Sequence, residues 1–171
     1  IGESRRQERG LGPEQAGLRA AFAGGSLAAA LSDEAGGEPL LRDELLTLLE
    51  HPKIIGVKHT SQNLYQLERL KSAAPHAVIY NGFDEMFVGG IAMGADGAIG
   101  TTYNVMGRRF VRIFDALTAG DLAAALALQS QANEVIDVLI EVGVLPGTKA
   151  MLKALGLDCG PCRRPFAPLT P

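Results

Sequence analysis

The chain has 171 residues and a mass of 18.0 kDa, with 47% apolar and 20% charged residues, which is the composition of a globular protein with one sizeable core. Sixteen Lys and Arg against nineteen Asp and Glu give a net charge of −3, so there is no basic field to hold a nucleic acid. Two cysteines are too few for a disulfide framework, and no run of about 18 apolar residues indicates a membrane span. We expect a soluble cytoplasmic protein whose partners include neither nucleic acid nor membrane.

Residues 1–40 differ in composition from the rest of the chain. Arginines are mixed with glycines and alanine runs, and neither a helical nor a strand period persists. We interpret the segment as a weakly structured or non-native lead-in, for instance from a reading-frame error or a joined fragment, with at most a short helix over Ser26–Leu31. A twin-arginine export signal at Arg5-Arg6 is the alternative, but glycines interrupt the apolar region that it requires. The organised domain is expected over residues 41–171.

From Pro39 onward the pattern alternates between helices and short apolar strands. Leucines at helical spacing predict a helix from Leu41 that ends before His51-Pro52. Further elements are predicted in this order: a strand over 53–58, a helix capped by Ser61 and reaching Ala73, a strand over 77–80, a helix over 84–93, a strand over 98–101, a helix around 106–117, a helix capped by Asp121 and reaching Val142, and a helix over 148–155. Repeated strand and helix units indicate a parallel α/β fold, either doubly wound or a barrel.

Lys58 ends the first of these strands. Side chains alternate along a strand, so Ile54, Gly56 and Lys58 share one face. Burial disfavours the charged form of an amine, and a neutral lysine is a nucleophile that can form a Schiff base with a ketone. Thr60 points the same way and can offer its hydroxyl to the same ligand. The alternative is a lysine that emerges at the strand end and reaches solvent.

Polar residues also follow the second and third strands. Gly82, Asp84 and Glu85 come after the second strand, and Thr101 ends the third. Ligands of parallel α/β proteins bind at the carboxyl ends of strands, where glycine permits close approach and carboxylates accept hydrogen bonds from sugar hydroxyls. For Asp84 and Glu85 the alternative is a purely structural place in the first turn of a helix, where the dipole favours acidic residues.

The sequence Cys159-Gly160-Pro161-Cys162 matches the thioredoxin-type redox loop. A helix stop precedes it and Arg163-Arg164-Pro165 follows, whereas a redox pair of this kind begins a helix, so a redox module is a minor alternative. Three histidines lie in separate elements, with His59 on the strand face opposite Lys58. No metal site is predicted.

Four segments, in this order and spacing, resemble the N-acetylneuraminate lyases, which are pyruvate-dependent class I aldolases related to dihydrodipicolinate synthase: residues 56–61, 80–85, 94–104 and 162–166. The resemblance implies a (β/α)8 TIM barrel with a C-terminal helical extension. It implies that residues 41–171 correspond to the last three strand–helix units of the barrel and most of the extension. A cysteine before Arg-Arg-Pro-Phe is normal for the family, which makes the Cys-x-x-Cys match accidental.

The same resemblance implies a role for each candidate site residue. Lys58 would form the Schiff base with the C2 ketone of sialic acid or of pyruvate, so no cofactor is needed. The hydroxyls and the backbone of the sugar portion would be held by Thr60, Gly82, Asp84, Glu85 and Thr101. The implied partners are sialic acid, pyruvate and N-acetylmannosamine, together with further copies of the chain, since the family is usually tetrameric.

Two elements of the family have no counterpart in the sequence: the Gly-Ser/Thr-Thr-Gly-Glu loop that binds the pyruvate carboxylate, and the tyrosine that relays the proton. A complete barrel needs about 250 residues. We therefore expect the 171-residue chain by itself to be inactive or nearly so, because positioning and proton transfer are incomplete. The alternatives are a non-catalytic half-barrel that pairs its open sheet edges with another chain or itself, and a related pyruvate-dependent aldolase acting on another 2-keto acid.

Overall fold

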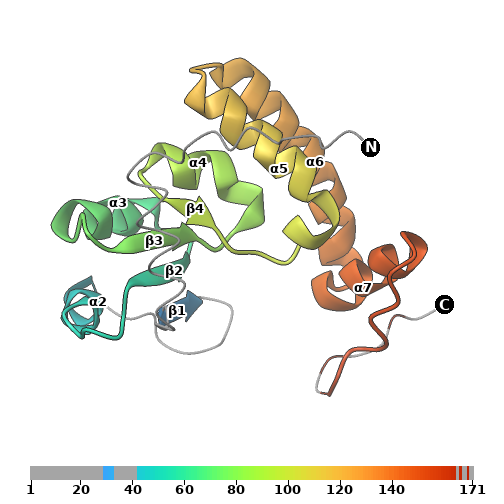
Figure 1. Cartoon of the computed structure of the whole chain (residues 1–171). Helices are drawn as coiled ribbons and strands as arrows, with labels where there is room; N and C mark the ends of the chain where they lie inside the picture. Colours follow the sequence, from blue (N-terminus) through green and yellow to red (C-terminus); the bar gives the residue numbers. More distant parts are fainter. Residues whose placement is uncertain (1–28, 33–41, 165, 167–168, 170–171) are drawn as a thin grey trace, which may run out of the picture.

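The structure is a computed structural model that describes residues 29–32, 42–164, 166 and 169 (Figure 1). A parallel sheet of four strands has the order β1-β2-β3-β4. The strands are β1 (Ala29–Ser32), β2 (Gly56–Thr60), β3 (Val78–Asn81) and β4 (Gly97–Ala98). The spatial order follows the chain order without the reversal that a doubly wound sheet shows, so the sheet is part of a barrel.

Helices follow each strand, and two more close the chain. They are α2 (Arg42–Leu49), α3 (Leu64–Ala73), the 3-10 turn η2 (Asp84–Met86), α4 (Phe87–Ala92), α5 (Tyr103–Thr118), α6 (Leu122–Val142) and α7 (Val144–Ala154). The three predicted strand–helix units and the helical extension are therefore confirmed, within one to four residues at most boundaries. None of the helices in the described ranges is long and apolar enough to cross a membrane.

Two local predictions are corrected. A short helix is predicted over Ser26–Leu31, but its described residues 29–31 belong to strand β1, which pairs with β2. The N-cap of α3 is Asn63, whose Oδ1 accepts from Gln66 N at 3.0 Å, whereas the Ser61 hydroxyl accepts from the Asn63 amide. Residues 1–28 and 33–40 of the predicted lead-in lie outside the described residues.

The first core lies between the sheet and helices α2 and α3. It contains the strand residues Val57 and Ile79, which are paired in register and fully buried. Helix residues complete it: Leu45, Leu49, Leu67 and Leu70. Because side chains alternate along a strand, the neighbours Lys58 and Tyr80 point to the opposite face of the sheet.

The segment 94–97, which leads into β4, is hydrogen-bonded to the backbone of Ile79 in this core. Asp96 N donates to Ile79 O at 2.8 Å, and the Asp96 carboxylate accepts from Ile79 N at 2.8 Å. The same carboxylate binds Lys71 Nζ at 2.8 Å, and Lys71 also donates to Ala77 O. Asp96 thus links the last turn of α3 to the edge of β3.

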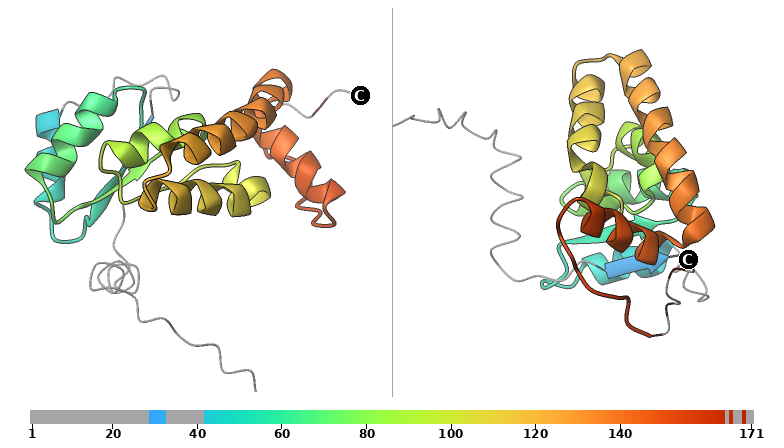
Figure 2. Two further views of the ribbon diagram at one scale, coloured as in Figure 1. Left: turned by 90° about the horizontal axis from the view of Figure 1, so that it is seen from above. Right: turned by 90° about the vertical axis from the view of Figure 1, so that its right-hand side faces the viewer.

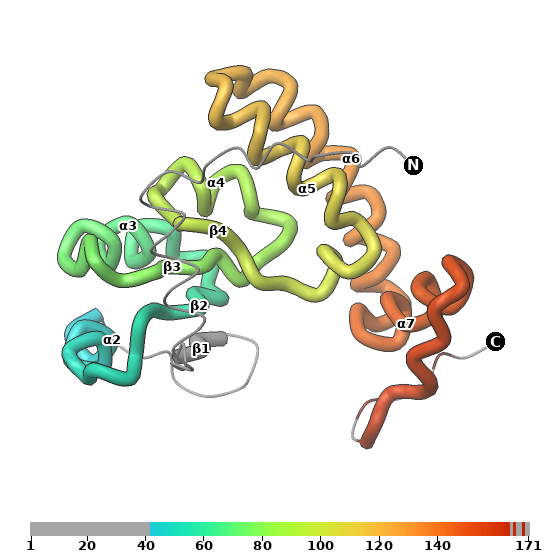
Figure 3. The backbone as a smooth tube through the Cα atoms, viewed as in Figure 1, coloured from blue at the N-terminus to red at the C-terminus, as the bar shows by residue number. Residues whose placement is uncertain are grey.

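The second core lies under the helix pair α5 and α6, which run side by side in all views, and the C-terminal end of α6 leads into α7 (Figures 1, 2 and 3). Its aromatic centre is formed by Phe87, Tyr103 and Phe110, whose rings meet edge to face with centroids 4.4–6.1 Å apart. Ile91 of α4 packs against both cores. The sheet side and the helix pair therefore meet at α4.

Candidate active site

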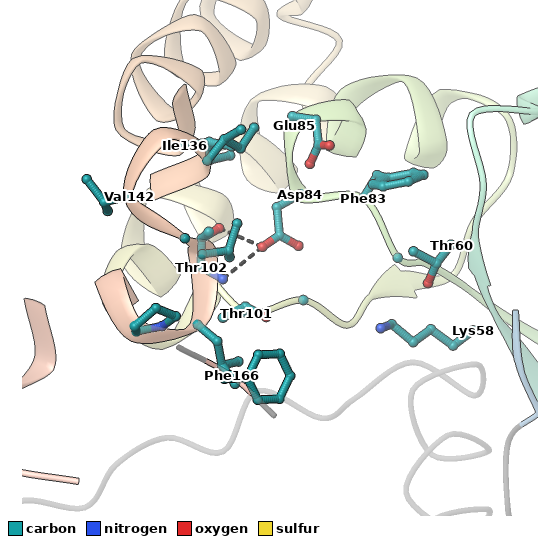
Figure 4. A pocket seen from close by; sticks show the side chains of 17 residues that line it. Lys58, Thr60, Phe83, Asp84, Glu85, Thr101, Thr102, Ile136, Val142 and Phe166 are labelled. Carbon is teal, nitrogen blue, oxygen red and sulfur yellow. Dashed lines mark hydrogen bonds between the residues drawn. The ribbon is translucent and has the colours of Figure 1, made fainter. Parts of the chain in front are cut away.

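All six site residues predicted from the sequence line a single pocket of about 500 Å³ (Figure 4). They are Lys58, Thr60, Gly82, Asp84, Glu85 and Thr101. They come from the carboxyl ends of β2, β3 and β4, as expected for a parallel α/β protein. The opposite wall is apolar and belongs to the junction of α6 and α7, with Ile136, Ile140, Val142 and Pro146.

Lys58 is half-buried, and its side chain extends into the pocket (Figure 4). Its strand neighbours point the other way: Val57 is in the first core, and His59 Nε2 lies 3.1 Å from Gln66 Oε1 of α3. The predicted opposition of Lys58 and His59 across the strand is confirmed. The alternation of side chains along β2 therefore places the Lys58 amine on the side of the sheet that faces the pocket.

Thr60 and Gly82 form the floor beside Lys58. Gly82 N donates to His59 O at 2.8 Å, and a Cβ on Gly82 would overlap the Thr60 side chain. Only glycine permits this approach of the two strand ends. Thr60 is 7% exposed, and its hydroxyl has no hydrogen-bond partner among the described residues. A hydrogen bond from this buried hydroxyl to a ligand would lower the free energy of the complex, because the hydroxyl is otherwise unsatisfied.

Asp84 is 6% exposed and lies in the first turn of η2, the structural place that the sequence offered as its alternative, but its contacts also reach across the chain. Its Oδ2 accepts from Thr102 N at 2.8 Å and from Thr102 Oγ1 at 2.7 Å, which holds the start of α5 (Figure 4). A Cβ on Gly100 would overlap the carboxylate, so this glycine is also required. The other oxygen, Oδ1, is buried without a partner in the described parts of the chain.

Glu85 and Thr101 are half-buried at the same pocket. Glu85 follows Asp84 in the η2 turn, and Thr101 precedes the N-cap residue Thr102. The pocket therefore combines one amine, the hydroxyls of three threonines and two carboxyls against an apolar wall. This set can form a covalent bond to a ketone while binding a polyhydroxylated chain.

Two polar residues of α6, buried Gln129 and half-buried Asn133, were missed by the sequence analysis. Gln129 Oε1 accepts from Val88 N at 3.1 Å, and its Nε2 donates to Asp84 O at 3.1 Å. Asn133 Nδ2 donates to Glu85 O at 3.2 Å. The available signal was an amide pair four residues apart on the stripe that also carries Ala125, Ala132 and Ile136.

Tyr103 lies behind the pocket with its hydroxyl buried. Burial, together with the nearby Asp84 carboxylate, raises the pKa of Tyr103 well above the ordinary range. Burial also raises the pKa of Tyr80, with a smaller contribution from Asp96. Both tyrosines are thus held neutral in structural positions, and neither lines the pocket that contains Lys58.

The two cysteines lie after α7 as free thiols, Cys159 exposed and Cys162 half-buried. They belong to a separate surface region, where Cys162 lines a hollow together with Lys149 and Pro161. Among the described residues there is no group of three or more His, Cys, Asp or Glu that could hold a metal ion.

A run of parallel strands with a half-buried lysine at one strand end, followed by a helical extension, defines part of an aldolase-type (β/α)8 barrel. The profile of the Dihydrodipicolinate synthetase family matches residues 33–171. The chain belongs to this family.

Curated relatives of the chain are lyases. The chain is 58% identical over 123 residues to the N-acetylneuraminate lyase of Rhizobium meliloti (strain 1021), covering 72% of this chain and 41% of the relative. It is 46% identical over 134 residues to the N-acetylneuraminate lyase of Salmonella typhimurium, covering 78% of this chain and 45% of the relative. The chain therefore spans less than half the length of these relatives.

Solved structures show the same fold. The N-acetylneuraminate lyase of Fusobacterium nucleatum complexed with pyruvate superimposes with a TM-score of 0.78 at 35% identity, over 86% of this chain and 50% of that one. The sialic acid aldolase of Ruminococcus gnavus gives a TM-score of 0.80 at 29% identity, over 90% of this chain and 52% of that one. A catalytic lysine mutant of the Ruminococcus enzyme matches equally well.

Proposed function

We propose that this chain carries the Schiff-base lysine and the sugar-binding wall of an enzyme that cleaves N-acetylneuraminate to N-acetylmannosamine and pyruvate. The observation that carries the proposal is the position of Lys58, which enters one pocket with Thr60, Gly82, Asp84, Glu85 and Thr101. The names of the relatives support the same reaction.

In this reaction the Lys58 amine adds to the C2 ketone of the open-chain sugar acid and water leaves, which gives an iminium ion. The C4 hydroxyl gives its proton to a general base and its O–H electron pair forms the aldehyde C4=O bond. The C3–C4 bond breaks, its electron pair forms the C2=C3 double bond of an enamine, and the π pair of the iminium bond moves to nitrogen. N-acetylmannosamine leaves as the aldehyde, and protonation and hydrolysis of the enamine release pyruvate and the free amine. The Thr60 hydroxyl and the Asp84 and Glu85 carboxyls face the pocket, where they bind the hydroxyls of the sugar chain.

The proposal is tested by trapping. Purified chain is incubated with pyruvate and reduced with borohydride, and the adduct is located by peptide mass mapping. We expect the adduct on Lys58, its loss in Lys58→Met, and its retention in Lys53→Met, because Lys53 is an exposed lysine outside the pocket. Absence of an adduct, with Lys58 freely labelled by amine reagents, would overturn the proposal for this chain.

Turnover requires more than the Schiff base. We expect no measurable lyase activity from the 171-residue chain alone, because the sequence holds no carboxylate-binding loop and no relay tyrosine. Sustained release of pyruvate from N-acetylneuraminate by the purified chain would contradict this expectation. A related pyruvate-dependent aldolase is the second candidate, and trapping with other 2-keto acids distinguishes it.

We further propose that the chain associates with copies of itself in the cytoplasm, in a tetramer as the family resemblance implies. The sheet supports association, since β1 and β4 each have only one neighbouring strand among the described residues. Two free cysteines are compatible with a reducing compartment. A non-catalytic half-barrel that pairs through these edges would associate without forming the borohydride-trapped adduct.

A further inference from the structure

We infer that Gln129 and Asn133 of α6 are positioning residues that select substrates with a polyhydroxylated chain, an inference that rests on the proposed function. Both lie behind the η2 turn, and neither lines the pocket. Their amide groups bind the backbone of the turn whose side chains, Asp84 and Glu85, face the pocket.

The contacts of Gln129 fix the turn at both ends. Oε1 accepts from Val88 N at 3.1 Å, where α4 begins, and Nε2 donates to Asp84 O at 3.1 Å, where η2 begins. Gln129 is 6% exposed, so these bonds form away from water. A buried backbone amide or carbonyl that loses its partner is costly, which holds the turn in one conformation.

Asn133 completes the arrangement. Its Oδ1 accepts from Gln129 Nε2 at 2.8 Å, which fixes the orientation of both side-chain amides. Its Nδ2 donates to Glu85 O at 3.2 Å. The backbone carbonyls of Asp84 and Glu85 are therefore each bound by a side-chain amide of α6. These bonds set the directions in which the Asp84 and Glu85 side chains leave the backbone.

Lys58 does not depend on this arrangement, since β2 places it through the sheet. The two parts of the site are therefore separable. A small 2-keto acid such as pyruvate needs the amine, whereas N-acetylneuraminate also needs the carboxyls of the turn. Disturbing the amide pair should impair binding of the long substrate and spare the short one.

The test is the variant Asn133→Asp, which keeps the size and the acceptor atom but replaces the donor to Glu85 O with a carboxylate oxygen. Borohydride-trapped adducts on Lys58 are measured against concentration of pyruvate and of N-acetylneuraminate, whose adducts differ in mass. We expect the half-saturating concentration of N-acetylneuraminate to rise by about tenfold while that of pyruvate stays within about twofold. Gln131→Glu is the matched control, because Gln131 is exposed on the same helix, and it should change neither value.

The ratio of the two half-saturating concentrations separates positioning from general loss of structure. A fold that is merely weakened changes both concentrations together, and an unchanged or equally shifted pair would overturn the inference while leaving Lys58 as the Schiff-base residue. If wild type traps neither ketone, the proposed function fails instead. Hydrogen exchange then decides the inference: the amides of residues 84–88 must exchange faster in Asn133→Asp and Gln129→Ala than in wild type, and equal rates would overturn it.

Discussion

At the scale of single residues, the pocket depends on places where a side chain is absent. Gly82 lies against the Thr60 side chain, and Gly100 lies against the Asp84 carboxylate. In both pairs the side chain of a pocket residue occupies the space that a side chain on the glycine would need. The strand ends can therefore approach closely enough to share one ligand.

Gly82→Ala should destabilise the chain by about 1–3 kcal/mol, because the added methyl group must displace Thr60 in a packed environment. Gly107→Ala is the matched control, since Gly107 lies in helix α5 and an added methyl group there would project into open space. That variant should stabilise by about 0.5–1 kcal/mol through helix propensity. Urea unfolding measures both, and equal effects of the two substitutions would contradict the close approach.

Tyr103 gives stability a dependence on alkaline pH. Burial and the Asp84 carboxylate raise its pKa, so the unfolded chain releases the phenolic proton at lower pH than the folded chain does. This contribution is complete below the ordinary tyrosine pKa of about 10 and is lost as pH rises toward the folded value, by about 1.4 kcal/mol per pH unit. In Tyr103→Phe the unfolding free energy should therefore fall less steeply with pH above pH 10 than in wild type, by about 1.4 kcal/mol per pH unit.

The control for this prediction is Tyr65→Phe, since Tyr65 is 69% exposed. Its unfolding free energy should follow the wild-type curve across the same pH range. Urea titrations between about pH 8 and 11 provide the measurement. Identical curves for wild type and Tyr103→Phe would show that the hydroxyl is not held neutral by the fold.

At the scale of elements, sequence patterns predicted those features that depend on neighbouring residues. Asp121 caps α6 as predicted, with its Oδ1 accepting from Ala124 N at 2.9 Å. Lys58 and Thr60 share a face because strand alternation is local. Ser61 and Asn63 both offer an oxygen ahead of α3, and periodicity could not decide which of them caps the helix.

Features that depend on distant partners were not predictable from the pattern. Gln129 meets Asp84 O across 45 positions of sequence, and Asp84 meets Thr102 across 18. A backbone carbonyl leaves no signature in the sequence, so nothing marked the amides of α6 as its donors. Strand β1 was missed because its Ala-Ala-Leu-Ser sequence lacks the β-branched residues that indicate strands; its pairing with β2 is what makes it a strand.

At the scale of the whole molecule, several large apolar side chains of the helix pair are exposed. Each of the following is more than half exposed: Val111, Leu122, Leu126, Val138 and Ile140. Several exposed apolar side chains on two adjacent helices are typical of surfaces that are covered by another chain or segment. They support the proposed association independently of the sheet edges.

Sedimentation equilibrium should therefore show self-association of the chain, with the apparent mass rising with concentration above that of an 18.0 kDa monomer. The double variant Leu122→Glu and Leu126→Glu, at exposed positions of α6, should shift association to higher concentration by about tenfold or more. Arg108→Glu serves as the control for the charge change, since it is also exposed on the helix pair. A monomer at every concentration would contradict the prediction.

The pocket lies where the two cores meet, with Lys58 and Thr60 on the sheet side and Ile136 and Ile140 on the helix pair. A molecule that touches both walls therefore adds a further link between two parts that already join through α4, through the bonds of α6 to the η2 turn and through Asp84 and Thr102. Its binding energy adds to the cohesion of the whole chain as well as to that of the site. The melting temperature of the ligand-bound protein then reports how tightly a compound binds, and a ligand that contacts both walls should raise it more than one that contacts only the lysine side.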